Sequence, residues 1–489
     1  MTPPQRNAER PVAALLAPDI LALLDESPAN VAAETEELHP ANLADVAELL
    51  PVVRIAQLLR ALPPARAGDV LEYLDDDLRT DVLEALSPKQ AAALVSEMTP
   101  DDRADAIEDL EEAHAEDILS EIPLAARGET ERLLAYPPES AGGLMTTEFV
   151  SVAQDLLVEE ALRIVRAAAR VGRREAIYTI YATDAGGRVR GVLSLRELLA
   201  APEGSRVSDL AWTDIVTVPA TADREEVARI TSKYDLVAVP VVDEGGRIIG
   251  VVTVDDVIDA MVEEQTEDVQ MLGGVQPLEQ PYSQATFWDI VIKRGGWLIL
   301  LFLEEMLTGS ALRAYQNELN AVLALSFFIP LIISSGGNSG SQSATLITRA
   351  LAVGDVRLRD TLRVLVRELG QGITLGIFLG AIGFARTVMP RPYGWGNGHA
   401  LALVVALTLV AVVLAGTLVG AMLPLVFTKI GFDPAIASSP FVASLVDVLG
   451  LIIYFSIARQ ILHLGPLTAA LGGGGGPFGQ FAQHAMHLT

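Results

Sequence analysis

One carboxylate, Asp447, lies within a long apolar segment near the end of the chain, in the run SLVDVLGLIIYF. At membrane depth an ionised aspartate costs about 2.5 to 3.5 kcal/mol even on insertion scales, so it is expected to face a polar path or a partner. Two roles remain open from the sequence. Asp447 coordinates a cation, or it is hydrogen-bonded to a neighbouring helix, for example to Asn338 or a hydroxyl.

A second apolar segment is interrupted by small and polar residues at 334–352, which read SSGGNSGSQSATLITRALA. Because lipid offers no hydrogen-bond partners, polar side chains and exposed backbone at membrane depth must pack against protein or line a watery path. We therefore expect the backbone around Gly336 and Gly337 to be loosened, so that the helix is broken there. Together with Asn338, this stretch would leave room for water near Asp447.

A further group of oxygen ligands comes from an acidic run ahead of the apolar half, where no basic residue occurs between Arg247 and Lys293. The acids that recur on neighbouring helical turns are Asp256, Asp259, Glu263, Glu264, Glu267 and Asp268. A helix with this many carboxylates repels itself, and divalent cations held by oxygen ligands are the simplest neutraliser. A solvated linker helix is the alternative.

Asp101 and Asp105 lie four residues apart in DDRADA and share one helical face. Two like charges at this spacing destabilise a helix unless a cation or a donor offsets them. A solvated acidic helix start, favoured by the helix dipole, explains the same pattern.

Two other acids in the apolar half have competing interpretations. Glu368 follows Arg367 near an expected inner surface, so it forms an ion pair with Arg363 or Arg367, or it lies at the entrance of a pore. Asp433 precedes a proline, where it fits helix capping as well as attraction of ions.

Composition limits the class of protein. The 489 residues are 51% hydrophobic, contain no cysteine and carry a net charge of −28. Residues 1–294 hold 55 acids and 25 bases, a net charge of −30, while the remainder carries +2. The acidic surface argues against nucleic acid as a partner and is compatible with divalent cations or with a solubilising role. We find no nucleophile–base constellation and no metal-ligand spacing among the six histidines, so the sequence does not indicate an enzyme.

The order of elements indicates a multidomain chain. Residues 1–135 read as short helices that begin at Pro40, Pro64, Pro88 and Pro100. Residues 140–262 alternate strands and helices twice, with GVLSLREL and GVVTVDDV as matching closing motifs. This duplication resembles a tandem pair of cystathionine-β-synthase (CBS) domains, which form clefts for nucleotides or ions in many families. An acidic connecting helix is expected at 263–294, and the Gly-rich tail at 466–489 is expected to be disordered.

The region 295–465 is expected to form an α-helical transmembrane domain in the lipid bilayer. This domain would contain five membrane-spanning helices, formed by the apolar segments near 297–312, 321–350, 362–388, 401–427 and 435–462. Glu304 and Glu305 in the first segment are unusual for a span. With residues 1–294 inside, eight basic residues flank the inner side and four the outer side. This bias predicts a multi-pass protein of the cell inner (plasma) membrane with cytoplasmic N-terminal domains and the C-terminus outside. The N-terminus has no apolar core of signal-peptide type.

The motifs PLIISSGGNSGSQSATLITRALA, GAMLPLVF, DPAIASSPFVASLVDVLGLIIYF and ESAGGLMTTEFV, in this domain order, resemble the MgtE family of bacterial magnesium channels. The resemblance implies a homodimer whose pore is lined by the second and fifth spans, with Asp447 binding hydrated Mg²⁺. It also implies cytosolic Mg²⁺-sensing carboxylates and a plug helix at about 265–287 that joins sensor to pore. The carboxylates that match are Asp256, Asp259, Glu264, Glu267 and Asp268, with Asp101 and Asp105 as the pair facing the CBS module.

The expected function is import of Mg²⁺ down the membrane potential through a channel that cytosolic Mg²⁺ closes, with ATP as a possible CBS ligand. An ion-coupled secondary transporter of Co²⁺ or Mn²⁺ and a membrane-anchored nucleotide sensor remain as alternatives.

Overall fold

The computed structural model describes residues 11–170, 179–278, 280, 282, 285–389 and 398–463. The chain divides into two units, residues 1–263 and 264–489. The tail predicted at 466–489 lies outside the described residues.

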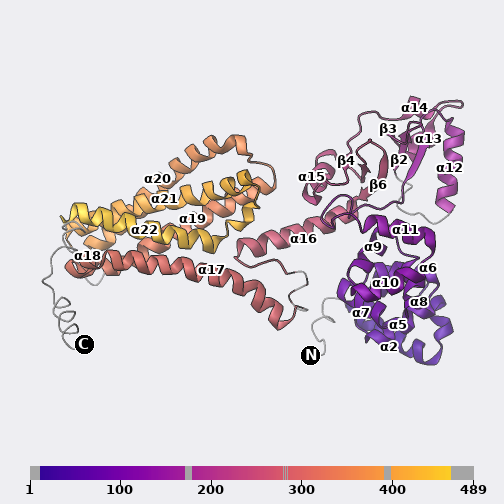
Figure 1. Ribbon diagram of the computed structural model, residues 1–489, viewed down its shortest axis with the longest axis horizontal. Coiled ribbons are helices and arrows are strands. Elements are labelled where there is room, and N and C mark those ends of the chain that lie inside the picture. The colour runs from indigo at the N-terminus through magenta and orange to yellow at the C-terminus, as the bar shows by residue number, and fades with distance from the viewer. Residues whose placement is uncertain are drawn as a thin grey trace, which may run out of the picture. The chain divides into compact units, whose positions relative to one another are not determined.

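The first unit begins with a stack of short helices (Figure 1). The predicted start signals are confirmed, because Pro40, Pro64, Pro88 and Pro100 each occupy the first turn of a helix, where no backbone N–H is required. Their apolar faces form one buried core that includes Leu43. The helices are α2 (Pro11–Glu26), η1 (Pro28–Asn30), α3 (Val31–Glu34), α4 (Pro40–Ala47), α5 (Val52–Ala61), α6 (Pro64–Glu72), α7 (Asp76–Glu84), α8 (Pro88–Val95), α9 (Pro100–Glu108), α10 (Glu112–Glu121) and α11 (Leu124–Leu133).

The predicted duplication is confirmed by two three-stranded sheets of identical topology. In each, the first strand pairs parallel with the second, and the second pairs antiparallel with the third. Both sheets have a register irregularity at the end of the second strand, after Ala182 and Val241. The first repeat contains β1 (Val150–Ala153), α12 (Val158–Arg170), β2 (Thr179–Thr183), β3 (Val189–Ser194), α13 (Leu195–Ala200) and α14 (Val207–Leu210). The second contains β4 (Val218–Pro219), α15 (Arg224–Tyr234), β5 (Ala238–Val242), β6 (Ile248–Thr253) and α16 (Val254–Leu272).

The connecting helix differs from the prediction. Helix α16 continues directly from the second repeat but ends at Leu272, so neither a helix over 263–294 nor one over 265–287 is present. Gly274 explains the stop, because its φ of +73° is a left-handed conformation that glycine adopts without a Cβ clash. The following helix begins only at Phe287.

The second unit consists mainly of long helices (Figure 1). Helix α19 packs against α21 and α22, α20 packs against α21, and α17 packs against α22. The elements are α17 (Phe287–Ala314), α18 (Gln316–Ala321), η3 (Leu323–Phe328), α19 (Ile329–Ala352), η4 (Leu358–Asp360), α20 (Thr361–Val388), α21 (His399–Ile430), η5 (Pro434–Ile436) and α22 (Ser439–Ile461).

Four helical stretches among the described residues are long and apolar enough to cross a membrane: 323–352, 358–388, 399–430 and 439–461. They correspond to the last four of the five predicted spans. Helix α17 is not one of the four, although its 28 residues exceed the roughly 20 that a bilayer core requires. The first span therefore stays a prediction.

The expected break in the second span is wrong. Helix α19 is continuous from Ile329 to Ala352 and includes Gly336, Gly337 and Gly340. A continuous helix satisfies its backbone hydrogen bonds internally, which is favoured at membrane depth. The glycines serve close packing instead: a Cβ at Gly336 would lie 2.4 Å from Cγ1 of Val412 on α21.

Candidate functional site: carboxylates in both units

The N-terminal acids gather at the start of α9. Asp101 is buried, with 7% of its surface exposed, and its Oδ1 has no hydrogen-bond partner among the described residues. Beside it, Asp102 Oδ2 accepts a hydrogen bond of 2.7 Å from Thr99 Oγ1. Burial, and then repulsion from Asp102, raises the pKa of Asp101 to about 7.

Two further acids surround this pair. Glu72 at the end of α6 accepts a hydrogen bond of 2.6 Å from the Thr99 backbone N–H, and burial followed by repulsion from Asp102 raises its pKa to about 7. Asp105 lies one turn beyond Asp101. The surrounding protein excludes water from the Asp105 carboxylate, and this desolvation, followed by repulsion from Asp101, raises the pKa of Asp105 to about 8. The residue is nevertheless more than a third exposed, so solvent screens part of this repulsion.

Asp256 brings the second repeat to the same place. Its Oδ2 accepts a hydrogen bond from Thr253 Oγ1 at the start of α16, as an N-terminal capping contact. Burial, and then repulsion from Asp101, raises the pKa of Asp256 well above its usual range. The structure therefore brings three predicted residues, Asp101, Asp105 and Asp256, into one acidic group. Asp259 is exposed one turn further along α16.

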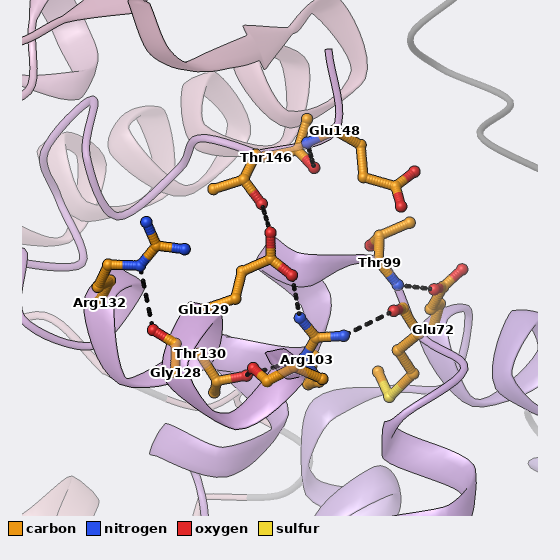
Figure 2. Close-up of polar contacts among 12 residues, drawn as sticks. Glu72, Thr99, Arg103, Gly128, Glu129, Thr130, Arg132, Thr146 and Glu148 are labelled. Atoms are coloured by element: carbon orange, nitrogen blue, oxygen red, sulfur yellow. Dashed lines mark hydrogen bonds and ion pairs between the residues drawn. The ribbon is translucent and has the colours of Figure 1, made fainter. Parts of the chain in front are cut away.

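A neutralised network holds α9 in position beside this group (Figure 2). Arg103 forms an ion pair of 3.0 Å with Glu129 and donates a 2.8 Å hydrogen bond from Nε to Thr130 Oγ1, both on α11. Thr147 Oγ1, in the segment leading to β1, donates to the other oxygen of Glu129. Arg103 is thus paired with Glu129 and not with the aspartates, whereas Arg79 opposes part of the rise in the pKa of Asp102 and of Asp105.

Sequence reasoning missed Glu72, Asp102 and the Arg103–Glu129 pair. Asp102 adjoins Asp101, so its proximity was readable, whereas Glu72 lies on a different helix. Within the described residues, no three His, Cys, Asp or Glu side chains are arranged to hold a metal ion directly. The acidic group therefore attracts cations electrostatically without forming a finished coordination shell.

A second acidic group lies in the second unit, where α16 ends. Burial, followed by repulsion from Asp433 and Glu264, raises the pKa of Asp268, while Arg349 opposes the shift. Asp433 also accepts a 2.6 Å hydrogen bond from the Ala435 backbone N–H, which confirms the capping interpretation. Glu267 lies beside Asp268 and adds to the same repulsion.

Asp447 lies against the backbone of α19. A Cβ on Gly337 would be 3.4 Å from Asp447 Oδ1 and 3.4 Å from the Cβ of Ala443. The carboxylate of Asp447 therefore lies beside α19 at the level of Gly337. Asn338 is exposed and its Nδ2 donates a 3.3 Å hydrogen bond to Ser334 Oγ, one turn earlier on α19. The alternative in which Asn338 donates to Asp447 is thus not the arrangement observed.

Glu304 and Glu305 now have a location. Helix α17 packs against α22, and both acids lie near enough to Asp447 to repel its charge. Glu304 Oε2 is buried and has no hydrogen-bond partner among the described residues. Glu304, Glu305 and Asp447 therefore lie close enough on α17 and α22 for their charges to interact.

Glu368 pairs with a hydroxyl and not with an arginine. Its side chain is 4% exposed and accepts a 2.9 Å hydrogen bond from Ser343 Oγ on α19. Arg363 instead pairs with Asp360, at 3.3 Å. The predicted ion pair with a neighbouring arginine is therefore not formed, because α20 turns Glu368 inward and the arginines outward. The position of Glu368 at a pore entrance stays a prediction.

Comparisons with known proteins agree with this organisation. The family described as "MgtE: Divalent cation transporter" matches residues 329–457, the MgtE intracellular N domain matches 38–139, and CBS domains match 141–204 and 207–263. A magnesium transporter MgtE from Thermus thermophilus is 46% identical over 338 residues, covering 69% of this chain and 73% of the relative. One from Bacillus subtilis is 32% identical over 349 residues, covering 71% and 74%.

Two solved structures are similar to about half of this chain. The soluble part of a magnesium transporter is 29% identical and covers 52% of this chain and 99% of its own, with a TM-score of 0.49. The cytosolic domain of the Mg²⁺ channel MgtE in complex with ATP is 38% identical and covers 49% and 96%, with a TM-score of 0.46. Since three family profiles match in the order of the domains, and relatives above 30% identity align over more than two thirds of their length, the chain belongs to the MgtE family of magnesium transporters.

Proposed function

We propose that the chain forms a homodimeric, channel-like importer that conducts Mg²⁺ down the membrane potential. The observation that carries this proposal is the position of Asp447 against α19, beside Gly337. Helices α19 and α22 correspond to the second and fifth predicted spans. Two copies of this pair around a two-fold axis would place two Asp447 carboxylates on one ion path.

The chemistry of the ion fits this arrangement. Mg²⁺ dehydrates reluctantly and prefers octahedral oxygen coordination at about 2.0 to 2.1 Å. A hydrated ion held by two carboxylates and by backbone carbonyls of α19 or α22 would therefore keep most of its water. Entry of a divalent cation gains about 4.6 kcal/mol per 100 mV of inside-negative potential, twice the value for a single charge. This gain drives uptake without ATP hydrolysis.

The two acidic groups supply a closing mechanism. In the first unit, Asp101 repels both Asp105 and Asp256, and in the second unit Asp433 repels Asp268. Cytosolic Mg²⁺ bound at these groups would remove the repulsion and stabilise a compact closed state. The ion shifts this equilibrium only by its differential affinity for the closed and open states. ATP in a CBS cleft would be a second regulatory ligand.

The orientation completes the proposal. If the N-terminal domains are cytoplasmic, the first acidic group lies on the side where Mg²⁺ accumulates, and the second group, between the end of α16 and the loop after α21, would face the same side. The excess of basic residues on that side supports this orientation. The C-terminus would then lie outside the cell membrane.

Transport is tested with Mg²⁺ flux into proteoliposomes carrying Asp447→Asn. We expect flux to be lost, because the amide is neutral and a weaker ligand for Mg²⁺. Asp355→Asn, at an exposed position of the same unit, is the matched control and should transport normally. Wild-type flux through Asp447→Asn would refute the assignment. Flux that requires a Na⁺ or proton gradient, or that favours Co²⁺ or Mn²⁺, would indicate a coupled transporter instead.

Closure is tested separately by patch recording of the double variant Asp101→Asn, Asp256→Asn. We expect openings to persist at internal Mg²⁺ concentrations that close the wild type. Asp214→Asn, exposed on the first unit, controls for loss of one charge. Unchanged closure of the double variant would exclude this acidic group as the sensor.

A further inference from the structure

Arginines gather where α20 begins, which is unusual in so acidic a chain. A shallow hollow of about 590 Å³ lies on this surface of the second unit. It is lined by Arg359, Asp360, Leu362, Arg363, Val366 and Arg367. All three arginines are exposed.

The hollow combines positive charge with exposed apolar surface on one face of α20. Leu362 is 72% exposed and Val366 is 62% exposed, and they adjoin Arg363 and Arg367 on the same helical face. The opposite face is buried, with Val364 7% exposed. The apolar face continues along α20 through exposed residues that include Leu369, Ile373, Ile377 and Phe378. The arginines therefore lie at the end of a helix face that lipid chains are expected to cover.

The positive charge of the hollow is only partly compensated. Asp360 is the one acid in its lining, and its Oδ1 accepts a 3.3 Å hydrogen bond from Arg363 Nη1. The other oxygen, Oδ2, accepts a 3.2 Å hydrogen bond from the Arg357 backbone N–H and so caps the preceding helical turn. Arg359 and Arg367 form no ion pair with any residue that the structure describes. Two guanidinium groups are thus free to bind an anion in this surface.

We propose that the hollow binds the phosphate headgroup of an anionic phospholipid in the inner leaflet. Guanidinium groups bind phosphate oxygens in a bidentate fashion, and the inner leaflet carries anionic lipid. A phospholipid fits better than free phosphate because Leu362 and Val366 offer its acyl chains a surface beside the arginines. The choice of leaflet rests on the proposed function, which places the start of α20 on the cytoplasmic side.

The consequence concerns the packing of the transporter. Helix α20 is held to α21 by close approach of Gly372, Gly376 and Gly380 to its neighbour. A lipid bound at the first turn of α20 would therefore stabilise the α20–α21 pair from its membrane-facing side. Thermal stability and transport should both depend on anionic lipid.

The binding test uses the purified full-length chain in detergent, titrated with phosphatidylglycerol and, in parallel, with phosphatidylcholine. Native mass spectrometry counts the lipids retained per chain. We expect phosphatidylglycerol to bind preferentially, and its affinity to fall on the order of fivefold for each arginine replaced in the series Arg359→Gln, Arg363→Gln, Arg367→Gln. Arg386→Gln, at the other end of the same helix, is the charge-matched control for each single variant and should bind as the wild type does.

Three outcomes would overturn the proposal. The triple variant binds phosphatidylglycerol as tightly as the wild type, phosphatidylcholine is retained equally well, or excess inorganic phosphate displaces the lipid and marks the hollow as a free-phosphate site. The lipid count requires no Mg²⁺ flux, so it remains decisive if the transport assignment fails. Elution of the triple variant at the wild-type volume confirms that the lost binding does not come from unfolding. The triple Arg→Lys variant, which keeps the charge, should retain most of the preference for phosphatidylglycerol.

Discussion

The contact between α19 and α21 should be intolerant of a single methyl group. A Cβ at Gly420 on α21 would lie 2.0 Å from the carbonyl oxygen of Gly340 on α19. A second contact, from Gly416 to the oxygen of Gly336, would be 2.4 Å. Carbon–oxygen contacts across helices normally lie at about 3.3 to 3.6 Å. Gly420→Ala must therefore move the two helices apart by roughly 1.3 Å, because both colliding groups belong to the backbone or are fixed to it.

This displacement has a cost in stability and a cost in function. Overpacking of a tight interface destabilises by about 1 to 3 kcal/mol, and the better helix propensity of alanine recovers at most about 1 kcal/mol. Helix α19 also carries Gly337, which lies against Asp447. A displacement of α19 by this amount would therefore also move the backbone that lies beside Asp447 and alter the proposed ion path. We therefore expect Gly420→Ala to remain folded but to lose most of its Mg²⁺ flux.

The assay compares Mg²⁺ uptake and thermal unfolding of Gly420→Ala with those of Gly370→Ala. Gly370 lies within α20, and an added Cβ there meets no atom within 4 Å. The control variant should therefore keep wild-type flux and gain slightly in stability. The reasoning is refuted if Gly420→Ala transports at the wild-type rate, or if both alanine variants lose flux equally.

Three other predictions concern buried charges. The pKa of Glu72 is about 7 in the folded chain against an ordinary 4.5, so the folded state holds more protons between these values. Its contribution to stability is therefore lost as the pH rises from 4.5 to 7. Without Mg²⁺, the protection of amides in α6 and α9, measured against the intrinsic exchange rate at the same pH, should be lower at pH 8 than at pH 5. Glu368→Ala should destabilise the second unit by about 2 to 4 kcal/mol in thermal unfolding, whereas Glu368→Gln, which still accepts from Ser343, should cost less than half as much. Glu318 is 3% exposed and pairs with Arg459. Arg459→Gln should therefore lower the free energy of unfolding by about 3 to 5 kcal/mol, because it leaves a buried carboxylate without a partner. In a double-mutant cycle, adding Glu318→Gln should restore part of that stability.

Much of the fold was predictable because its signals are local. Proline in a first helical turn marks the start of α4, α6, α8 and α9 whatever packs around them. The two CBS repeats follow from alternation of strands and helices, and their sheets share one topology. The last four apolar segments follow from length and composition. The end of α16 was less visible, because Gly273 and Gly274 stop the helix before the acidic and apolar pattern changes.

The candidate sites were predicted only in part. The sequence selected Asp447, Asp101 and Asp256 because acids in apolar or acid-rich segments need an explanation. The predicted ion pair of Glu368 was suggested by Arg367, its neighbour in the sequence. Its observed partner, Ser343, is distant in the sequence and is brought close by packing of α19 and α20 against α21.

The sequence by itself determined where helices start, that one domain is duplicated, and which carboxylates lie where an ionised side chain is energetically unfavourable. Helix periodicity and the price of charge in an apolar medium act within a segment. Only the tertiary structure decided which carboxylates meet, that α19 stays unbroken, and that its glycines serve contact with α21. These outcomes depend on side chains far apart in sequence, because packing at a helix interface is set by both partners together.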